Sequence, residues 1–94
     1  MDAKSAIKTA KAYVQDIFSD EGVLNIGLEE ISYDDKTLTW DVTVGFSRRW
    51  DSQNAPFAAA LQAPSYRRTY KIVEVSDATG EVLSVRNRAS EFAA

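Results

Sequence analysis

The stretch LTWDVTVGFS, residues 38–47, decides how this chain folds. Large apolar side chains occupy every second position, and threonine, aspartate, glycine or serine stands between them. Because successive side chains of a β-strand point to opposite faces, this period of two predicts a strand with one dry face and one polar face. The dry face is formed by Leu38, Trp40, Val42, Val44 and Phe46.

The segment before this stretch predicts another strand, over residues 23–33. Its apolar phase slips at Glu29 and Glu30, which indicates a β-bulge or a bend there. The polar run at residues 34–37 has the composition of a turn. The two segments are therefore expected to form a hairpin.

The second half of the chain predicts a further hairpin. Residues 65–76 and 81–88 are rich in β-branched and aromatic side chains and read as the third and fourth strands. Between them lies DATG, residues 77–80, whose glycine provides the positive φ that a tight turn requires. Residues 89–94 are expected to form a frayed tail.

The N-terminal segment, residues 3–19, predicts a helix, because its apolar residues recur at steps of three and four. Asp2 or Ser5 is expected to cap its start, and Gly22 stands where a helix-terminating glycine is common. The apolar stripe comprises Ala3, Ile7, Ala10, Val14, Ile17 and Phe18, widened by Ala6 and Tyr13.

The order of these elements predicts the fold class. One helix followed by strands joined through hairpins indicates an α+β domain, with the N-terminal helix packed across an antiparallel sheet of three or four strands. The 94 residues suffice for a single domain with one modest core. The connection between the second and third strands, residues 48–64, is long for such a domain, and long connections are often functional.

The composition excludes several kinds of chemistry. The chain has no cysteine and no histidine, so disulfides, thiolate catalysis and Ser–His–Asp or Cys–His devices are absent, and the usual zinc sites lack their ligands. We expect no metal, no cofactor and no enzymatic activity. The net charge of −3 argues against nucleic acid as a partner. The chain shows no export signal or membrane-spanning run, so a cytoplasmic location is expected.

The charges are segregated along the sequence. Residues 48–71 carry five basic side chains and one acidic one, whereas residues 22–47 carry five acidic side chains and one basic one. A hairpin of the second and third strands would gather the basic side chains and a tryptophan at the base of its connection. There they would hold an acidic protein surface, a phosphate or single-stranded nucleic acid. The candidate partner-binding residues are Arg48, Arg49, Trp50, Phe57, Leu61, Arg67 and Arg68.

Other interpretations of these charges stay open. The arginines would equally form ion pairs with acidic side chains of the neighbouring strands and keep the strand edges soluble. Glu29, Glu30 and Asp41 suggest paired carboxylates for acid–base catalysis, but neighbours on a strand point to opposite faces, which favours a solvated strand. Asp34 and Asp35 lack the spacing of a calcium loop and favour a turn.

Two segments carry a resemblance to a known family. Ala6, Ile7 and Ala10 of the predicted helix resemble the opening of a PepSY-type domain, and the hairpin YKIVEVSDATGEVL, residues 70–83, resembles its closing strands. The likeness covers about half of the chain. It implies a helix packed on an antiparallel sheet in the manner of cystatins. It also implies a role in binding or restraining a partner, as in peptidase propeptides.

These observations lead to three hypotheses. The first is a non-enzymatic, inhibitor-like module that binds a protein through the surface around residues 48–68. The alternative is a cone-shaped small-molecule-binding or enzymatic domain, with Tyr33, Asp41 or Tyr70 in a pocket between helix and sheet. The third is a homodimer formed through a sheet face or edge. The sheet face would consist of Val73, Val75, Leu83 and Val85.

Overall fold

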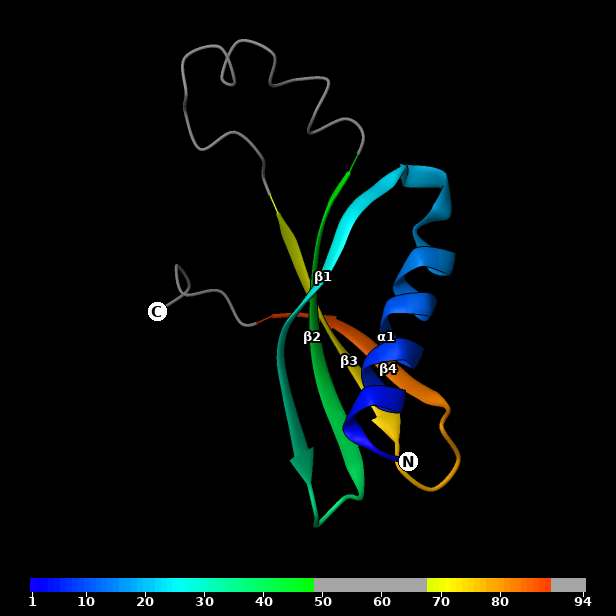
Figure 1. The fold of residues 1–94 in the computed structure, drawn as a ribbon, viewed down its shortest axis with the longest axis vertical. Coiled ribbons are helices and arrows are strands. Elements are labelled where there is room, and N and C mark those ends of the chain that lie inside the picture. The colour runs from blue at the N-terminus through cyan, green and yellow to red at the C-terminus, as the bar shows by residue number, and fades with distance from the viewer. Residues whose placement is uncertain (49–67, 89–94) are drawn as a thin grey trace, which may run out of the picture.

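The structure, a computed structural model, describes residues 1–48 and 68–88. One helix packs on a four-stranded antiparallel sheet whose spatial order follows the sequence, β1-β2-β3-β4 (Figure 1). The predicted fold class and element order are therefore confirmed. The elements are α1 (Ala3–Ile17), the short 3-10 helix η1 (Ser19–Glu21), β1 (Val23–Asp34), β2 (Thr39–Arg48), β3 (Thr69–Ser76) and β4 (Val82–Asn87).

Some predictions fall outside the described residues. They concern nearly all of the connection predicted at 48–64, the predicted start of the third strand at 65–67 and the predicted tail at 89–94. Within the described part, each strand begins and ends within a few residues of its prediction.

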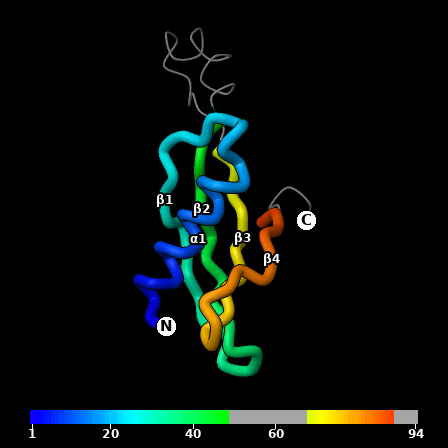
Figure 2. The backbone as a smooth tube through the Cα atoms, turned by 90° about the vertical axis from the view of Figure 1, so that its right-hand side faces the viewer, coloured from blue at the N-terminus to red at the C-terminus, as the bar shows by residue number. Residues whose placement is uncertain are grey.

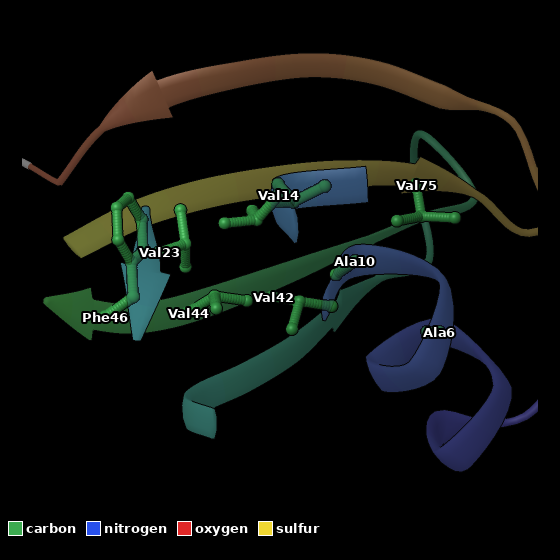
Figure 3. Packing of buried hydrophobic residues seen from close by; sticks show 9 residues of the cluster. Ala6, Ala10, Val14, Val23, Val42, Val44, Phe46 and Val75 are labelled. Carbon is green, nitrogen blue, oxygen red and sulfur yellow. The ribbon is translucent and has the colours of Figure 1, made fainter. Parts of the chain in front are cut away.

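The strand β2 lies at the centre of the fold and shows the alternation that the sequence predicts. Val42, Val44 and Phe46 are completely buried on the face that meets α1. Val42 stands opposite Val73 of β3, so the apolar rows of neighbouring strands join into one layer (Figure 3). Burying each such side chain contributes about 1.5–3 kcal/mol, so this layer supplies much of the stabilisation.

The helix α1 covers one face of the sheet and runs alongside its strands (Figure 2). Ala6, Ala10 and Val14, spaced four residues apart, form its fully buried line. Two of the three are alanines, so the helix backbone lies close to the sheet. The predicted stripe is shifted: Tyr13 and Ile17 are 39% and 44% exposed, because the line through Ala6 rather than the one through Ile17 faces β2.

The ends of the helical segment follow local chemistry. The side chain of Asp2 accepts a hydrogen bond from the Ser5 amide at 2.8 Å, which selects Asp2 over Ser5 as the cap. This bond satisfies one of the amide groups that every helix leaves unpaired in its first turn. Gly22, with a φ of 64°, reverses the chain after η1, as predicted.

The edge strand β1 is irregular in two places. One extra residue lies between Leu28 and Glu30, which confirms the predicted bulge. A second extra residue lies between Leu24 and Gly27, where Asn25 has a positive φ of 56°. Asparagine tolerates this left-handed conformation better than most residues.

Two expectations about apolar residues are wrong. Leu38 lies in the turn before β2 with a φ of 56° and is 53% exposed, so it does not belong to the dry face. Val73 and Val75 are fully buried beneath α1 and offer no exposed sheet face for a homodimer. The predicted surface of three valines and one leucine fails because its members face different ways. Leu83 is exposed next to a register shift, whereas Val85 packs against the core.

Candidate functional site

The sheet face that points away from α1, called here the open face, carries the polar phase of β2. Asp41, Thr43, Gly45 and Ser47 alternate with the core residues and therefore lie on it. Of the elements that the structure describes, none packs across this face (Figure 1). Thr43, Gly45 and Ser47 are nevertheless buried on this face, whereas Asp41 is partly exposed.

A pair of glycines makes a gap in the open face. Gly27 of β1 and Gly45 of β2 stand opposite each other in the register. A Cβ atom added to Gly45 would lie 2.8 Å from Cε1 of Tyr70 and 3.1 Å from Nη2 of Arg68. The first distance is shorter than real Cβ contacts show and the second is tight, so Tyr70 and Arg68 would have to shift to admit a side chain at position 45.

Arg68 extends across the sheet through this gap. It leaves the chain next to β3, and its Nη2 donates a hydrogen bond to the carbonyl oxygen of Asn25 on β1 at 3.0 Å. Its Nη2 also lies 3.7 Å from the position of a Cβ on Gly27. The end of the Arg68 side chain thus lies beside both glycines.

Tyr70, which lies beside Gly45 together with Arg68, also contacts a second cation. The guanidinium carbon of Arg88 lies 4.0 Å from the centroid of the Tyr70 ring, and the Arg88 amide donates to the Tyr70 carbonyl oxygen at 3.4 Å. A cation over an aromatic ring is attracted by the negative face of the π-system. These three side chains, which lie on the same face of the sheet, are named here the Arg68–Tyr70–Arg88 cluster.

A buried hydroxyl lies beside this cluster. Ser47 follows Gly45 by two positions on the same face, and only 1% of its surface is exposed. Its Oγ has no hydrogen-bond partner among the residues that the structure describes. Farther along β2, Asp41 pairs through Oδ2 with Nη2 of Arg86 at 3.5 Å, so the open face has a mixed charge away from the cluster.

Arg48 lies on the other side of the sheet. Its Nε is 2.6 Å from Oε1 of Glu21, and its Nη1 donates to Oγ1 of Thr69 at 2.9 Å. Its guanidinium carbon lies 5.4 Å and 5.3 Å from the ring centroids of Phe18 and Phe46. Arg48 therefore closes one corner of the core under the end of the helical segment.

The two described members of the predicted basic patch, Arg48 and Arg68, do not lie together. Arg48 and Arg68 lie on opposite faces, because Arg48 continues the phase of Phe46 whereas Arg68 shares the phase of Tyr70. The other predicted contact residues lie outside the described residues: Arg49, Trp50, Phe57, Leu61 and Arg67.

The structure adds two residues that the predicted set lacked, Tyr70 and Arg88. The spacing of two between Arg68 and Tyr70 already indicates a shared face. Arg88 carries no such signal, because it follows the last strand and reaches Tyr70 only through the β3–β4 pairing.

The alternative pocket between helix and sheet does not collect its predicted residues. Asp41 and Tyr70 lie on the open face, away from α1. Tyr33 is 41% exposed and packs against Trp40, with ring centroids 4.7 Å apart. The apolar core occupies the space that this hypothesis assigned to a pocket.

The opposite end of the sheet has the reverse charge. Asp77 accepts a hydrogen bond from Nε1 of Trp40 at 2.9 Å, and its carboxylate lies 3.6 Å from the Met1 amino group. Partial loss of hydration raises the pKa of Tyr33 above its usual 10.0, and the charges of Asp77 and of the acidic turn after β1 add to this rise. This end of the molecule would attract cations rather than anions.

Comparisons with protein-family models, with curated proteins and with solved structures gave no match for this chain. The resemblance to PepSY-type domains therefore stays a prediction. Neither helix that the structure describes is long and apolar enough to cross a membrane. Within residues 1–48 and 68–88, acidic side chains do not gather in a group that would hold a metal ion.

Proposed function

We propose that this chain is a non-enzymatic protein-binding module that holds an acidic segment of a partner on its open face. The observation that carries the proposal is the Arg68–Tyr70–Arg88 cluster, in which the Arg88 guanidinium lies over the Tyr70 ring and Arg68 and Tyr70 both lie beside Gly45. Arginine presents its donors in a planar fork that matches carboxylates, and charge-assisted hydrogen bonds of this kind are strong.

The cluster is held in place before any partner arrives. Tyr70 and Arg68 fill the space above Gly45, and the Asn25 carbonyl fixes one end of the guanidinium group. Arginine and tyrosine are among the residues that contribute most to binding at protein interfaces. Because these side chains are already ordered, a partner loses less of its binding energy to ordering them.

The charges of the open face favour protein over nucleic acid. Glu74 and Asp41 share the face with the cluster, and the whole chain has a net charge of −3. The carboxylates would repel the phosphate backbone of a nucleic acid, whereas a short acidic segment would contact the cluster alone. The open face thus supports a partner with a local negative charge.

The test is the affinity for a partner isolated with the full chain. The partner is captured, identified and purified, and its dissociation constant is then measured for the parent and for the double variant Arg68→Glu/Arg88→Glu. We expect a loss of about 100-fold or more, since two charge-assisted contacts become repulsive.

The matched control is Lys4→Glu/Lys8→Glu, which reverses two exposed charges on α1. The net charge of the two variants is the same, so a difference between them reports position rather than total charge. We expect the control to bind within about twofold of the parent. Equal affinity of the parent and the cluster variant would refute the proposed surface.

A further inference from the structure

The sheet has an edge at β4 with which no described strand pairs (Figure 2). β4 is the last strand in the order β1-β2-β3-β4, so only the side that faces β3 is hydrogen-bonded. Leu83 is 53% exposed. Glu81, Arg86 and Asn87 are exposed as well. The unpaired backbone groups of such an edge are a ready site for the addition of a further strand.

The hydrogen bonds between β3 and β4 show which backbone groups of this edge point outward. The Arg88 amide donates to the Tyr70 carbonyl oxygen at 3.4 Å, so the backbone of Arg88 faces β3. Residues of an antiparallel strand alternate between facing the partner strand and facing away from it. In the register with β3, the backbone of Arg86 therefore also faces β3, whereas the amide and carbonyl groups of Val85 and Asn87 point outward.

The apolar layer under α1 ends at the same edge. Val82 stands opposite Val75 and Val85 stands opposite Val73, so both valines of β4 extend the core. Val73 and Val75 are fully buried, but Val82 and Val85 are only half-buried. A strand added to β4 would place its own side chains beside these two valines and bury more of their surface.

The charges beside β4 are complementary to those of a second copy. Glu81 directly precedes the strand, and Arg86 lies near its end. Arg86 contacts Asp41 at 3.5 Å, but 46% of its side chain stays exposed. Two copies of β4 in antiparallel orientation place Glu81 of each copy near the arginine end of the other, whereas a parallel orientation places like charges together.

We propose that two copies of this chain associate through β4, in antiparallel orientation about a two-fold axis, so that their sheets join into one. Val85 and Asn87 of both copies supply the backbone hydrogen bonds. Extra residues interrupt the ladder of β1, the other edge, at two places, so association by strand addition stops at two copies. The inference goes beyond the proposed function, and neither depends on the other.

Sedimentation equilibrium of the full chain, at concentrations from about 10 μM to about 1 mM, tests the proposal. We expect a monomer–dimer equilibrium without larger species. Amide hydrogen exchange at the two ends of this range locates the contact. The amides of Val85 and Asn87 should exchange about tenfold more slowly at the high concentration, whereas the amide of Arg86, which already faces β3, should change much less.

The variant Leu83→Lys places a charge on the edge that the second copy would have to dehydrate, and we expect it to weaken the dimer about tenfold or more. The matched control is Ile17→Lys, which makes a similar exchange on α1, where the isoleucine is 44% exposed. We expect the control to dimerise within about twofold of the parent. Because both side chains are exposed, both variants should retain the fold, which the amide spectrum checks.

A second variant tests the orientation of the two copies. Glu81→Lys brings like charges together in the antiparallel arrangement, and we expect it to weaken the dimer about threefold. In the parallel arrangement the same substitution would leave the arginine ends unaffected and would not weaken the dimer. Tighter dimerisation of Glu81→Lys would therefore overturn the antiparallel orientation.

Other outcomes would overturn the dimer itself. A chain that stays monomeric up to about 1 mM, a dimer that Leu83→Lys leaves intact, or a dimer with unprotected Val85 and Asn87 amides would each do so. If these amides are protected only by the partner isolated for the proposed function, the edge takes a strand of another protein instead. If the dimer forms but that partner ignores Arg68→Glu/Arg88→Glu, the dimer stands and only the proposed partner surface is wrong.

Discussion

Arg48 and Arg68 flank the same connection between β2 and β3, yet they lie on opposite faces of the sheet and have different surroundings. Arg48 lies against two phenylalanine rings and pairs with Glu21, so it borders the core. Arg68 lies over two glycines and adjoins an aromatic ring on the open face. The difference shows that strand phase, rather than closeness in sequence, decides what a charged side chain does.

The same comparison extends to the aromatic residues of the two faces, where the largest effect is expected. Phe46→Ala should lower the free energy of unfolding by about 3–5 kcal/mol, because Phe46 is fully buried under α1. Tyr70→Ala should cost about 1 kcal/mol, since Tyr70 is only partly buried. Urea denaturation measures both values. Similar losses for the two variants would mean that the open face is as much a core as the helix-covered face.

The arginines themselves provide the next test. Arg48→Ala should lower the free energy of unfolding by about 1–2 kcal/mol through loss of its contacts with Glu21 and the phenylalanines, without affecting binding of an acidic partner. Arg68→Ala should change stability by at most about 0.5 kcal/mol and weaken the partner. Denaturation and titration of each variant give the four values. Exchanged behaviour of the two variants would contradict the assignment.

A smaller effect is expected at the helix that covers only one of the two faces. The hydrogen bond from the Ser5 amide holds the pKa of Asp2 below its usual 3.8. The folded state therefore prefers the ionised carboxylate, so the cap stabilises the protein above about pH 4. This contribution is lost as the pH falls through the lowered pKa.

The variant Asp2→Asn keeps a capping oxygen but does not ionise, so its stability should depend less on pH between 5 and about 2 than that of the parent. Thermal unfolding at several pH values provides the measurement. The acid dependence of the parent should exceed that of the variant, and equal slopes would show that the cap does not contribute. Binding at the open face should be unaffected at neutral pH.

The smallest effect concerns Tyr33 at the acidic end of the sheet. Its raised pKa means that the folded state prefers the protonated phenol, so its contribution to stability is present below pH 10.0 and decreases as the pH rises through the raised value. Tyr33→Phe removes this dependence. The absorbance of tyrosinate during alkaline titration reports the ionisation, and an unshifted midpoint for Tyr33 would disprove the expectation.

The sequence predicted the fold well because its main signals are local. The alternation along β2, the cap at Asp2 and the glycine at position 22 depend on residues close together in the chain. The misplaced Leu38 shows the limit of this approach. Its apolar character extends the alternation by one residue toward the N-terminus, but Leu38 belongs to the turn and β2 begins only at Thr39.

The candidate site was only partly predictable, because it depends on contacts between distant segments. Arg68 was identified from charge, yet its position over Gly45 follows from the register of three strands. The role of Arg88 depends on the pairing of β3 with β4. The importance of Gly45 is visible only when the atoms above it are known.

The two bulges of β1 have a consequence for how the protein behaves at high concentration. β1 is a 12-residue strand at an edge of the sheet, and a regular edge of this length offers a template on which further chains aggregate. The extra residues near Asn25 and Glu29 divide this edge into short pieces, and Glu29 and Glu30 add exposed negative charge to it. The irregularity that obscured the strand in the sequence therefore acts against fibrillar stacking along this edge.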